Sequence, residues 1–135
     1  MSAPAASASK DLEEGPVFSP RFSSDGLVAC VTVDAADGAV LMVAYMNAEA
    51  LEMTLSSGIV HYWSRSRGEL WRKGDTSGQV QTLVEMRVDC DQDALLARVS
   101  VGGDGGACHT GRRSCFYRRV ETTDGEARLA EIAKN

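Results

Sequence analysis

The apolar residues of this chain lie in short segments, and this pattern limits the possible folds more than any other feature. The longest uninterrupted apolar run is the eight residues Ala39 to Met46, whereas a helix that spans a membrane needs about 20. The segments Leu27–Val33 and Ala39–Tyr45 are rich in apolar residues and are joined by the turn sequence DAADG. They predict a β-hairpin with largely buried strands, and no membrane association is expected.

One helix and several strands are predicted after this hairpin. Asn47 is a candidate helix N-cap, Ala48–Ser57 is expected to be helical, and Gly58 is expected to end the helix. The alternation over Gln79–Asp89 predicts a half-buried strand. One side of that strand would carry Val80, Thr82, Val84, Met86 and Val88. The remaining predictions are strands over Ile59–Trp63, Leu95–Val101 and Cys115–Glu121 and a short terminal helix over Asp124–Lys134. The sum is an α+β fold of mainly antiparallel β strands with one or two short helices.

Length and charge narrow the class of protein. The 135 residues are enough for one domain with short appendages. Residues 1–16 are rich in Ala, Ser, Pro and Glu and are expected to form a flexible leader. They lack a basic start followed by an apolar core, so we predict no secretory signal and expect a cytoplasmic protein. The net charge of −5 argues against general nucleic-acid binding.

Three of the four cysteines have spacing that suits a metal. Cys90, Cys108 and Cys115 follow the pattern C-x17-C-x6-C, and thiolates are preferred zinc ligands. Three protein ligands with an open fourth position would indicate a catalytic zinc site, and four would indicate a structural one. The alternative is three unrelated cysteines that fill small apolar spaces. Cys30 lies inside an apolar strand pattern and is interpreted as a core residue.

The two histidines receive different interpretations. His109 directly follows Cys108, and adjacent side chains do not both point at one metal without special loop geometry. We therefore interpret His109 as a catalytic proton-transfer group near the metal, with a fourth zinc ligand or a surface histidine as alternatives. His61 lies in a predicted strand and is interpreted as structural.

An acidic triplet lies beside the first cysteine of this set. Asp89, Asp91 and Asp93 are spaced two apart, which on a strand would place three carboxylates on one face. Such like charges repel unless a cation is bound, and Mg²⁺ accepts carboxylate oxygens. The alternative is a solvated turn without an ion.

Basic and aromatic residues are concentrated in two short stretches. The glycine-punctuated segment 64–78 is interpreted as a functional loop, and residues 112–119 contain a second group of arginines. Such focusing in an acidic protein suits a small polyanionic ligand, with tryptophans to stack on a base and hydroxyls to bind phosphate. The alternative is a solvated basic face with both tryptophans in the core. The candidate ligand-binding residues are Trp63, Arg65, Arg67, Trp71, Lys73, Thr76, Ser77, Arg112 and Arg113.

Three motifs together resemble the phosphoribosyl-AMP cyclohydrolase family of histidine biosynthesis. They are YWSRSRGELWRKGDTSGQVQ (62–81), DCDQDALL (89–96) and GACHTGRRSCFYR (106–118). The likeness covers residues 17–121, which are expected to form the cyclohydrolase domain, while residues 122–135 form a C-terminal tail that includes the predicted helix. The chain is too short for the pyrophosphohydrolase domain that many relatives carry, so it resembles the stand-alone form. Asp75 stands where the family more often has Glu.

The resemblance implies more than the residues alone predict. It implies an intertwined homodimer with one zinc per subunit at the interface, bound by Cys90 of one chain and by Cys108 and Cys115 of the other. It also implies Mg²⁺ at Asp89, Asp91 and Asp93. The implied reaction is hydrolytic opening of the adenine ring of 1-(5-phosphoribosyl)-AMP at the N1–C6 bond, with zinc-activated water as the nucleophile.

Two other classes remain as alternatives. A zinc-stapled binding module would have four closed ligands and no turnover. A zinc nucleobase deaminase requires H-x-E followed by P-C-x-x-C. This sequence has neither element, because Trp63 and Gly111 stand two residues after the two histidines.

Overall fold

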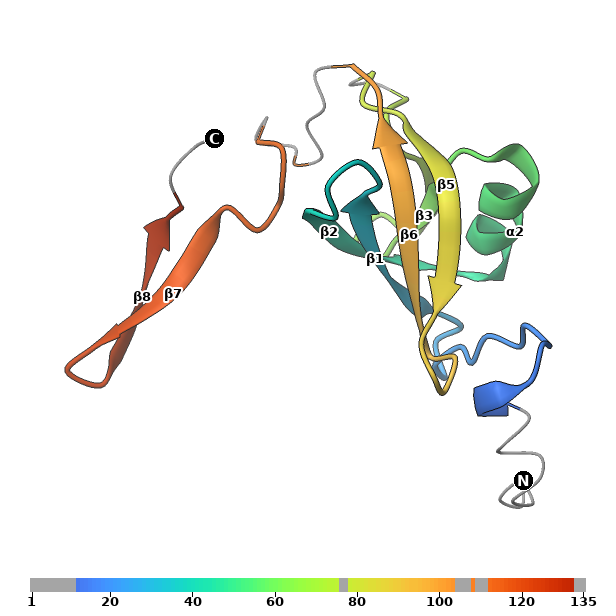
Figure 1. The fold of residues 1–135 in the computed structure, drawn as a ribbon, viewed down its shortest axis with the longest axis horizontal. Helices are drawn as coiled ribbons and strands as arrows, with labels where there is room; N and C mark the ends of the chain where they lie inside the picture. The colour runs from blue at the N-terminus through green and yellow to red at the C-terminus, as the bar shows by residue number, and fades with distance from the viewer. Residues whose placement is uncertain (1–11, 76–77, 104–107, 109–111, 133–135) are drawn as a thin grey trace.

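The computed structural model describes residues 12–75, 78–103, 108 and 112–132, which form an α+β domain and a projecting hairpin (Figure 1). In chain order the elements are β1 (Val28–Asp34), β2 (Val40–Met46), α2 (Ala48–Ser57), β3 (His61–Ser64), β4 (Glu69–Arg72), β5 (Gln81–Val88), β6 (Ala94–Val101), β7 (Arg118–Thr123) and β8 (Glu126–Glu131). The predicted α+β class with mainly antiparallel strands is confirmed. Within the described ranges, no helix has the length and apolar character needed to cross a membrane.

The central sheet has four strands in the order β2-β1-β6-β5. Its neighbours are antiparallel except for β1 and β6, which run parallel. Because a parallel pair needs a long crossover connection, the chain builds β2, α2, β3, β4 and β5 before it returns to β1. Strand β3, which the sequence predicted over Ile59–Trp63, forms a separate antiparallel pair with β4. β4 lies within the segment 64–78 that the sequence pattern indicated as a loop.

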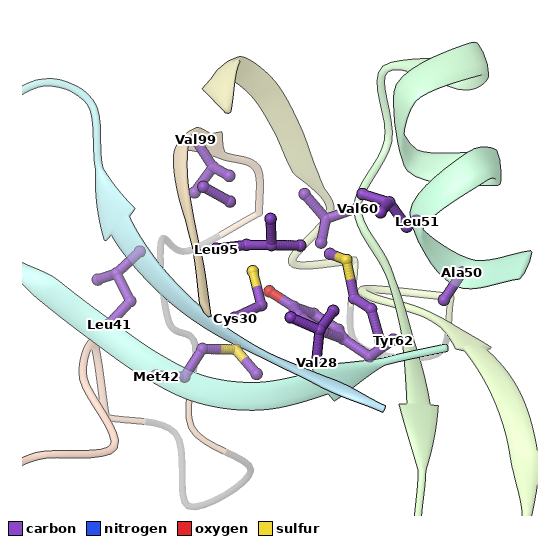
Figure 2. Close-up of a cluster of buried hydrophobic side chains, with 12 residues drawn as sticks. Val28, Cys30, Leu41, Met42, Ala50, Leu51, Val60, Tyr62, Leu95 and Val99 are labelled. Atoms are coloured by element: carbon purple, nitrogen blue, oxygen red, sulfur yellow. The ribbon is translucent and has the colours of Figure 1, made fainter. Parts of the chain in front are cut away.

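The hydrophobic core joins this sheet to β3 and α2 (Figure 2). Val28 and Leu95 from the sheet, Tyr62 from β3 and Leu51 from α2 are all buried in it. Cys30 is also fully buried there, and burial raises the pKa of its thiol to about 11. The interpretation of Cys30 as a core residue is therefore confirmed.

The helix begins and ends where its capping residues predict. The side chain of Asn47 accepts a hydrogen bond of 2.8 Å from the Ala50 N–H, which satisfies one of the free donors of the first turn. Gly58 has a φ of 76° and donates its N–H to the Thr54 carbonyl, as a left-handed C-cap does. The helix predicted over Ala48–Ser57 is confirmed.

The predicted alternation of β5 is wrong. Gln81 is fully buried, whereas Val84 is 56% exposed. The register of β5 against β6 shifts between Leu83 and Glu85, and such an irregularity changes which side chains face the core. Gln81 tolerates burial because its carbonyl accepts a 2.6 Å hydrogen bond from the Tyr62 hydroxyl, so its polar group is satisfied.

The helix predicted over Asp124–Lys134 is also wrong, because the described residues of this segment include strand β8 (Glu126–Glu131) and no helix. β8 pairs with β7 in an antiparallel hairpin. Asp124 and Gly125 at the tip have φ values of 53° and 78°, the left-handed pair that a tight hairpin turn requires. The Asp-Gly pair thus reverses the chain before a helix can begin.

Gly74 is required where the chain turns after β4. Its φ is 92°, and a Cβ atom there would lie 2.4 Å from the Val80 backbone nitrogen. We expect Gly74→Ala to destabilise the protein by about 3 kcal/mol or more, because strain and overlap with backbone add. Gly38→Ala is the matched control, since Gly38 has a φ of 78° but open space around it; it should cost only about 1 kcal/mol. Denaturant unfolding of both variants measures the difference, and equal losses would contradict the steric argument.

Candidate functional site

The three aspartates form a compact cluster at the turn between β5 and β6. One ligand atom from each of Asp89, Asp91 and Asp93 lies within 4.8 Å of the others. The cluster arises from a turn and not from one face of a strand, because Gln92 has a φ of 60°. Asp89 Oδ1 accepts hydrogen bonds of 3.0 Å from the Asp93 N–H and 3.1 Å from the Ala94 N–H. Clustered carboxylate oxygens are suitable ligands for a hard divalent cation.

The close carboxylates change one another's titration. Hydrogen bonding to the Asp91 and Asp89 side chains raises the pKa of Asp93 to about 6. Partial desolvation raises the pKa of Asp89, but hydrogen bonds from the Asp93 side chain and the Ala94 backbone outweigh it, so this pKa is lowered. The group therefore favours one shared proton or a bound cation over three free negative charges.

Two of the candidate zinc ligands lie together near β2. The Cys115 N–H donates a 2.7 Å hydrogen bond to the Leu41 carbonyl, and the neighbouring Ser114 hydroxyl donates to the Val40 carbonyl at 2.7 Å. Desolvation and the Cys108 thiol raise the pKa of Cys115 to about 11. Cys108 is buried. The contacts with β2 fix the position of Cys115, and the hydrogen bond between the two side chains shows that its thiol lies beside Cys108.

Lys73 interacts electrostatically with both thiols of this pair. It is only 7% exposed, and its Nζ lies 5.4 Å from the centre of the Trp71 ring. Burial lowers the pKa of Lys73, while the thiols of Cys115 and Cys108 oppose that shift. In turn, the Lys73 charge favours ionisation of Cys115. The arrangement places a positive charge where thiolates would form.

Cys90 lies apart from the other two cysteines of the set. It follows β5, at one edge of the four-stranded sheet, whereas Cys115 bonds to β2 at the opposite edge. Three strand spacings of the sheet correspond to about 14 Å. Among the described residues, the aspartate cluster is the one group of three or more potential metal ligands that lie close together. One chain therefore does not bring all three thiols to one point.

The candidate phosphate-binding residues divide into several groups. Arg113 pairs with Asp34 and Asp37 at 2.9 Å, and Arg112 pairs with Glu131 at 2.9 Å. Arg67 pairs with Glu69 at 3.2 Å. These three guanidinium groups already have carboxylate partners, and their role in ligand binding stays a prediction.

The remaining residues predicted to bind the ligand have different surroundings. The Arg65 guanidinium lies 4.0 Å from the centre of the Tyr45 ring. Trp71 packs against the hydrophobic core, with its ring centre 5.3 Å from that of Tyr62, and Trp63 on β3 is partly exposed. Thr76, Ser77 and His109 lie outside the described residues.

His61 lies on a strand as predicted, and its contacts support its interpretation as a structural residue. It is buried, and its Nδ1 lies 2.7 Å from the Ile59 carbonyl oxygen. Its backbone N–H donates to the Thr54 hydroxyl at 2.8 Å. These contacts connect β3 to α2.

Gln92 organises the aspartate turn, and the sequence analysis missed this role. The residue is only 4% exposed. Its side-chain amide donates to the carbonyls of Leu12 and Val17, and its Oε1 accepts from the Ser19 N–H at 2.7 Å. The end of the predicted leader is therefore anchored from Leu12 onward, while residues 1–11 lie outside the described residues. A glutamine between aspartates has no sequence signal that indicates burial.

A cavity of about 480 Å³ opens beside two of the aspartates. Its lining residues are Arg21, Phe22, Ser23, Leu27, Ala29, Tyr45, Asp91 and Asp93. The site region thus combines a carboxylate cluster, a cavity with a cation and aromatic rings, and a separate pair of thiols. Carboxylate oxygens and thiolates are the donor atoms that metal ions take in proteins, so the described residues are consistent with a metal-binding domain.

Comparison with known proteins defines the family. The family model described as phosphoribosyl-AMP cyclohydrolase matches residues 42–117. A phosphoribosyl-AMP cyclohydrolase of Brucella anthropi is 61% identical over 90% of this chain and 86% of its own length. The relatives of the same name from Mesorhizobium japonicum and Chelativorans sp. are 63% and 57% identical, over 90% and 96% of this chain and 80% and 93% of their own lengths. The chain belongs to the phosphoribosyl-AMP cyclohydrolase family.

Proposed function

We propose that this chain opens the adenine ring of 1-(5-phosphoribosyl)-AMP by hydrolysis of the N1–C6 bond, as a stand-alone cyclohydrolase of histidine biosynthesis. The observation that carries the proposal is the combination of close kinship to cyclohydrolases with a thiol pair and a carboxylate cluster in one chain. The product would be the formimino carboxamide ribotide. A reducing, cytoplasmic setting would keep the thiols of the proposed zinc ligands available for the metal.

Zinc would be held by Cys108 and Cys115 of one subunit and Cys90 of its partner. The adjacency of two thiols supports this assignment, since thiolates are zinc's preferred ligands. Cys115 must lose its proton to bind, and the Lys73 charge favours that loss. Zinc with an open fourth position lowers the pKa of water to about 7 and so supplies a nucleophile at neutral pH.

The homodimer is supported by the hairpin of β7 and β8. Figure 1 shows this hairpin projecting away from the sheet. Val120 and Leu129 pair across it, and they are 68% and 55% exposed. A two-stranded hairpin is marginally stable by itself in water, so packing on a second copy would stabilise it. The same association would bring the Cys90 of one subunit to the thiol pair of the other.

The other proposed residues would hold Mg²⁺, transfer protons and bind the substrate. Asp89, Asp91 and Asp93 would hold Mg²⁺, since their oxygens already converge. His109 follows a zinc ligand and would move protons, as base for the attack or as acid toward N1. Such a group contributes about 10²- to 10⁴-fold to rate. The substrate's two phosphates account for clustered cations, and Trp63 and Trp71 offer faces for its base.

Turnover of phosphoribosyl-AMP tests the proposal. Purified protein should form product, followed by ultraviolet absorbance, and chelation should abolish activity until zinc is added back. No ammonia should be released, because the ring-opening reaction keeps the exocyclic nitrogen. Ammonia release would instead support a deaminase. A folded, zinc-loaded protein without turnover would support the binding-module alternative.

A further inference from the structure

The cavity beside the aspartates is lined by an arginine, Arg21, that has no role in the function proposed above. Arg21 precedes β1, and its backbone N–H donates a 2.7 Å hydrogen bond to the carbonyl of Gln92. Because Gln92 lies between Asp91 and Asp93, this bond ties Arg21 directly to the aspartate turn. Its neighbour Phe22 packs against the hydrophobic core. The backbone of Arg21 is therefore held from both sides.

The segment that follows Arg21 is held as well. Ser23 donates its N–H to the Leu27 carbonyl at 2.8 Å, and Gly26 donates to the Ser23 carbonyl at 2.8 Å. These bonds close a turn that forms one wall of the cavity. Tyr45 of β2 contributes an aromatic ring to the lining, and Arg65 lies over that ring. Segments far apart in the sequence thus place one arginine in the lining and a second against it.

The Arg21 side chain differs from the other arginines near the site. Arg112 and Arg113 form salt bridges with carboxylates. Arg21 is exposed and, within the part of the chain that the structure describes, its guanidinium makes no ion pair. An arginine with free donors is suited to bidentate binding of a phosphate. The volume of about 480 Å³ also lies within the usual range for a small-molecule site.

We propose that Arg21 binds a phosphate of the nucleotide substrate in this cavity, with Arg65 and the Tyr45 ring beside it. The inference rests on the proposed function and adds a substrate-binding residue to it. Asp91 and Asp93 would repel a phosphate by themselves. A divalent cation at the aspartate cluster would remove that repulsion, and Arg21, whose backbone is bonded to the aspartate turn, would then bind the phosphate beside that cation.

Arg21→Gln tests this assignment, with Arg87→Gln as the matched control. Arg87 is also exposed, but it pairs with Glu85 and does not line the cavity. We expect Arg21→Gln to raise the KM for phosphoribosyl-AMP by about 10- to 100-fold, as loss of a charge-assisted hydrogen bond does. kcat should change by less than about threefold, and Arg21→Lys should recover part of the loss. Arg87→Gln should leave both constants unchanged.

A binding measurement separates this inference from the proposed reaction. Calorimetry in the presence of Mg²⁺ should show that Arg21→Gln binds ribose 5-phosphate at least about tenfold more weakly than the unsubstituted protein, while ribose without phosphate binds to neither. If the unsubstituted protein does not turn over phosphoribosyl-AMP, the proposed function fails, and the ribose 5-phosphate comparison still decides the role of Arg21. Three results would overturn the assignment. The first is equal binding of ribose 5-phosphate by Arg21→Gln and Arg87→Gln, and the second is an unchanged KM in Arg21→Gln. The third is that the unsubstituted protein neither turns over phosphoribosyl-AMP nor binds ribose 5-phosphate.

Discussion

Cys108→Ser is expected to abolish zinc binding and to reduce turnover of phosphoribosyl-AMP by at least about 10³-fold. Cys108 is buried beside Cys115, and the interaction of its thiol with Lys73 raises the pKa of that lysine against the effect of burial. Serine has nearly the same shape, so the fold should persist. Its hydroxyl does not ionise at neutral pH and does not replace a thiolate as a zinc ligand. Metal analysis of the purified variant, together with the turnover assay, measures both losses.

Two matched variants make this result specific. Cys30→Ala removes another buried thiol, but Cys30 lies in the core, so this variant should keep its zinc. His109→Ala should also keep its zinc and lose kcat by about 10²- to 10⁴-fold, because a general acid–base has been removed. Full activity in a zinc-free Cys108→Ser protein would contradict the zinc assignment. Loss of zinc in His109→Ala would make His109 a ligand.

Local signals in the sequence predicted the local structure well. Asn47 and Gly58 predicted both ends of α2, because capping depends on the residue itself and its next few neighbours. The turn after β1 was predicted for the same reason. The terminal hairpin was missed although its Asp124-Gly125 turn signal was present, since the residues after it also suit a helix.

Long-range contacts account for the other errors in the fold. The alternation of β5 predicted the wrong burial because Gln81 is buried through its bond to Tyr62, 19 residues away in the sequence. The parallel pairing of β1 with β6 joins segments separated by more than 50 residues. Such pairings depend on the whole fold and leave no local pattern in the strand itself.

In the candidate site, too, local features were predicted from the sequence and long-range contacts were missed. The spacing of Asp89, Asp91 and Asp93 predicted a carboxylate cluster, and the cluster is present, although a turn forms it. Arg21 and Gln92 were missed, because they meet across 71 residues of sequence through one backbone bond. The grouping of Cys90 with Cys108 and Cys115 stays a prediction, since it needs a second subunit.

We propose that each active site takes thiols from two subunits, and mixing two inactive variants tests this proposal most directly. Cys90→Ser lacks the thiol at the β5–β6 turn, and Cys115→Ser lacks one of the pair near β2. Each variant alone should be inactive, because every site in its homodimer has a missing ligand. In a mixed dimer, one site combines both defects, while the other contains the intact Cys90 and the intact Cys108–Cys115 pair.

The measurement is zinc-dependent turnover after the two variants are unfolded together and refolded at equal concentrations. Random pairing should make half of the dimers mixed, with one intact site in each, so we expect roughly a quarter of the activity of the unsubstituted protein. The same treatment of each variant alone should give none. Absence of activity in the refolded mixture, with mixed dimers demonstrated by mass spectrometry, would contradict the shared site.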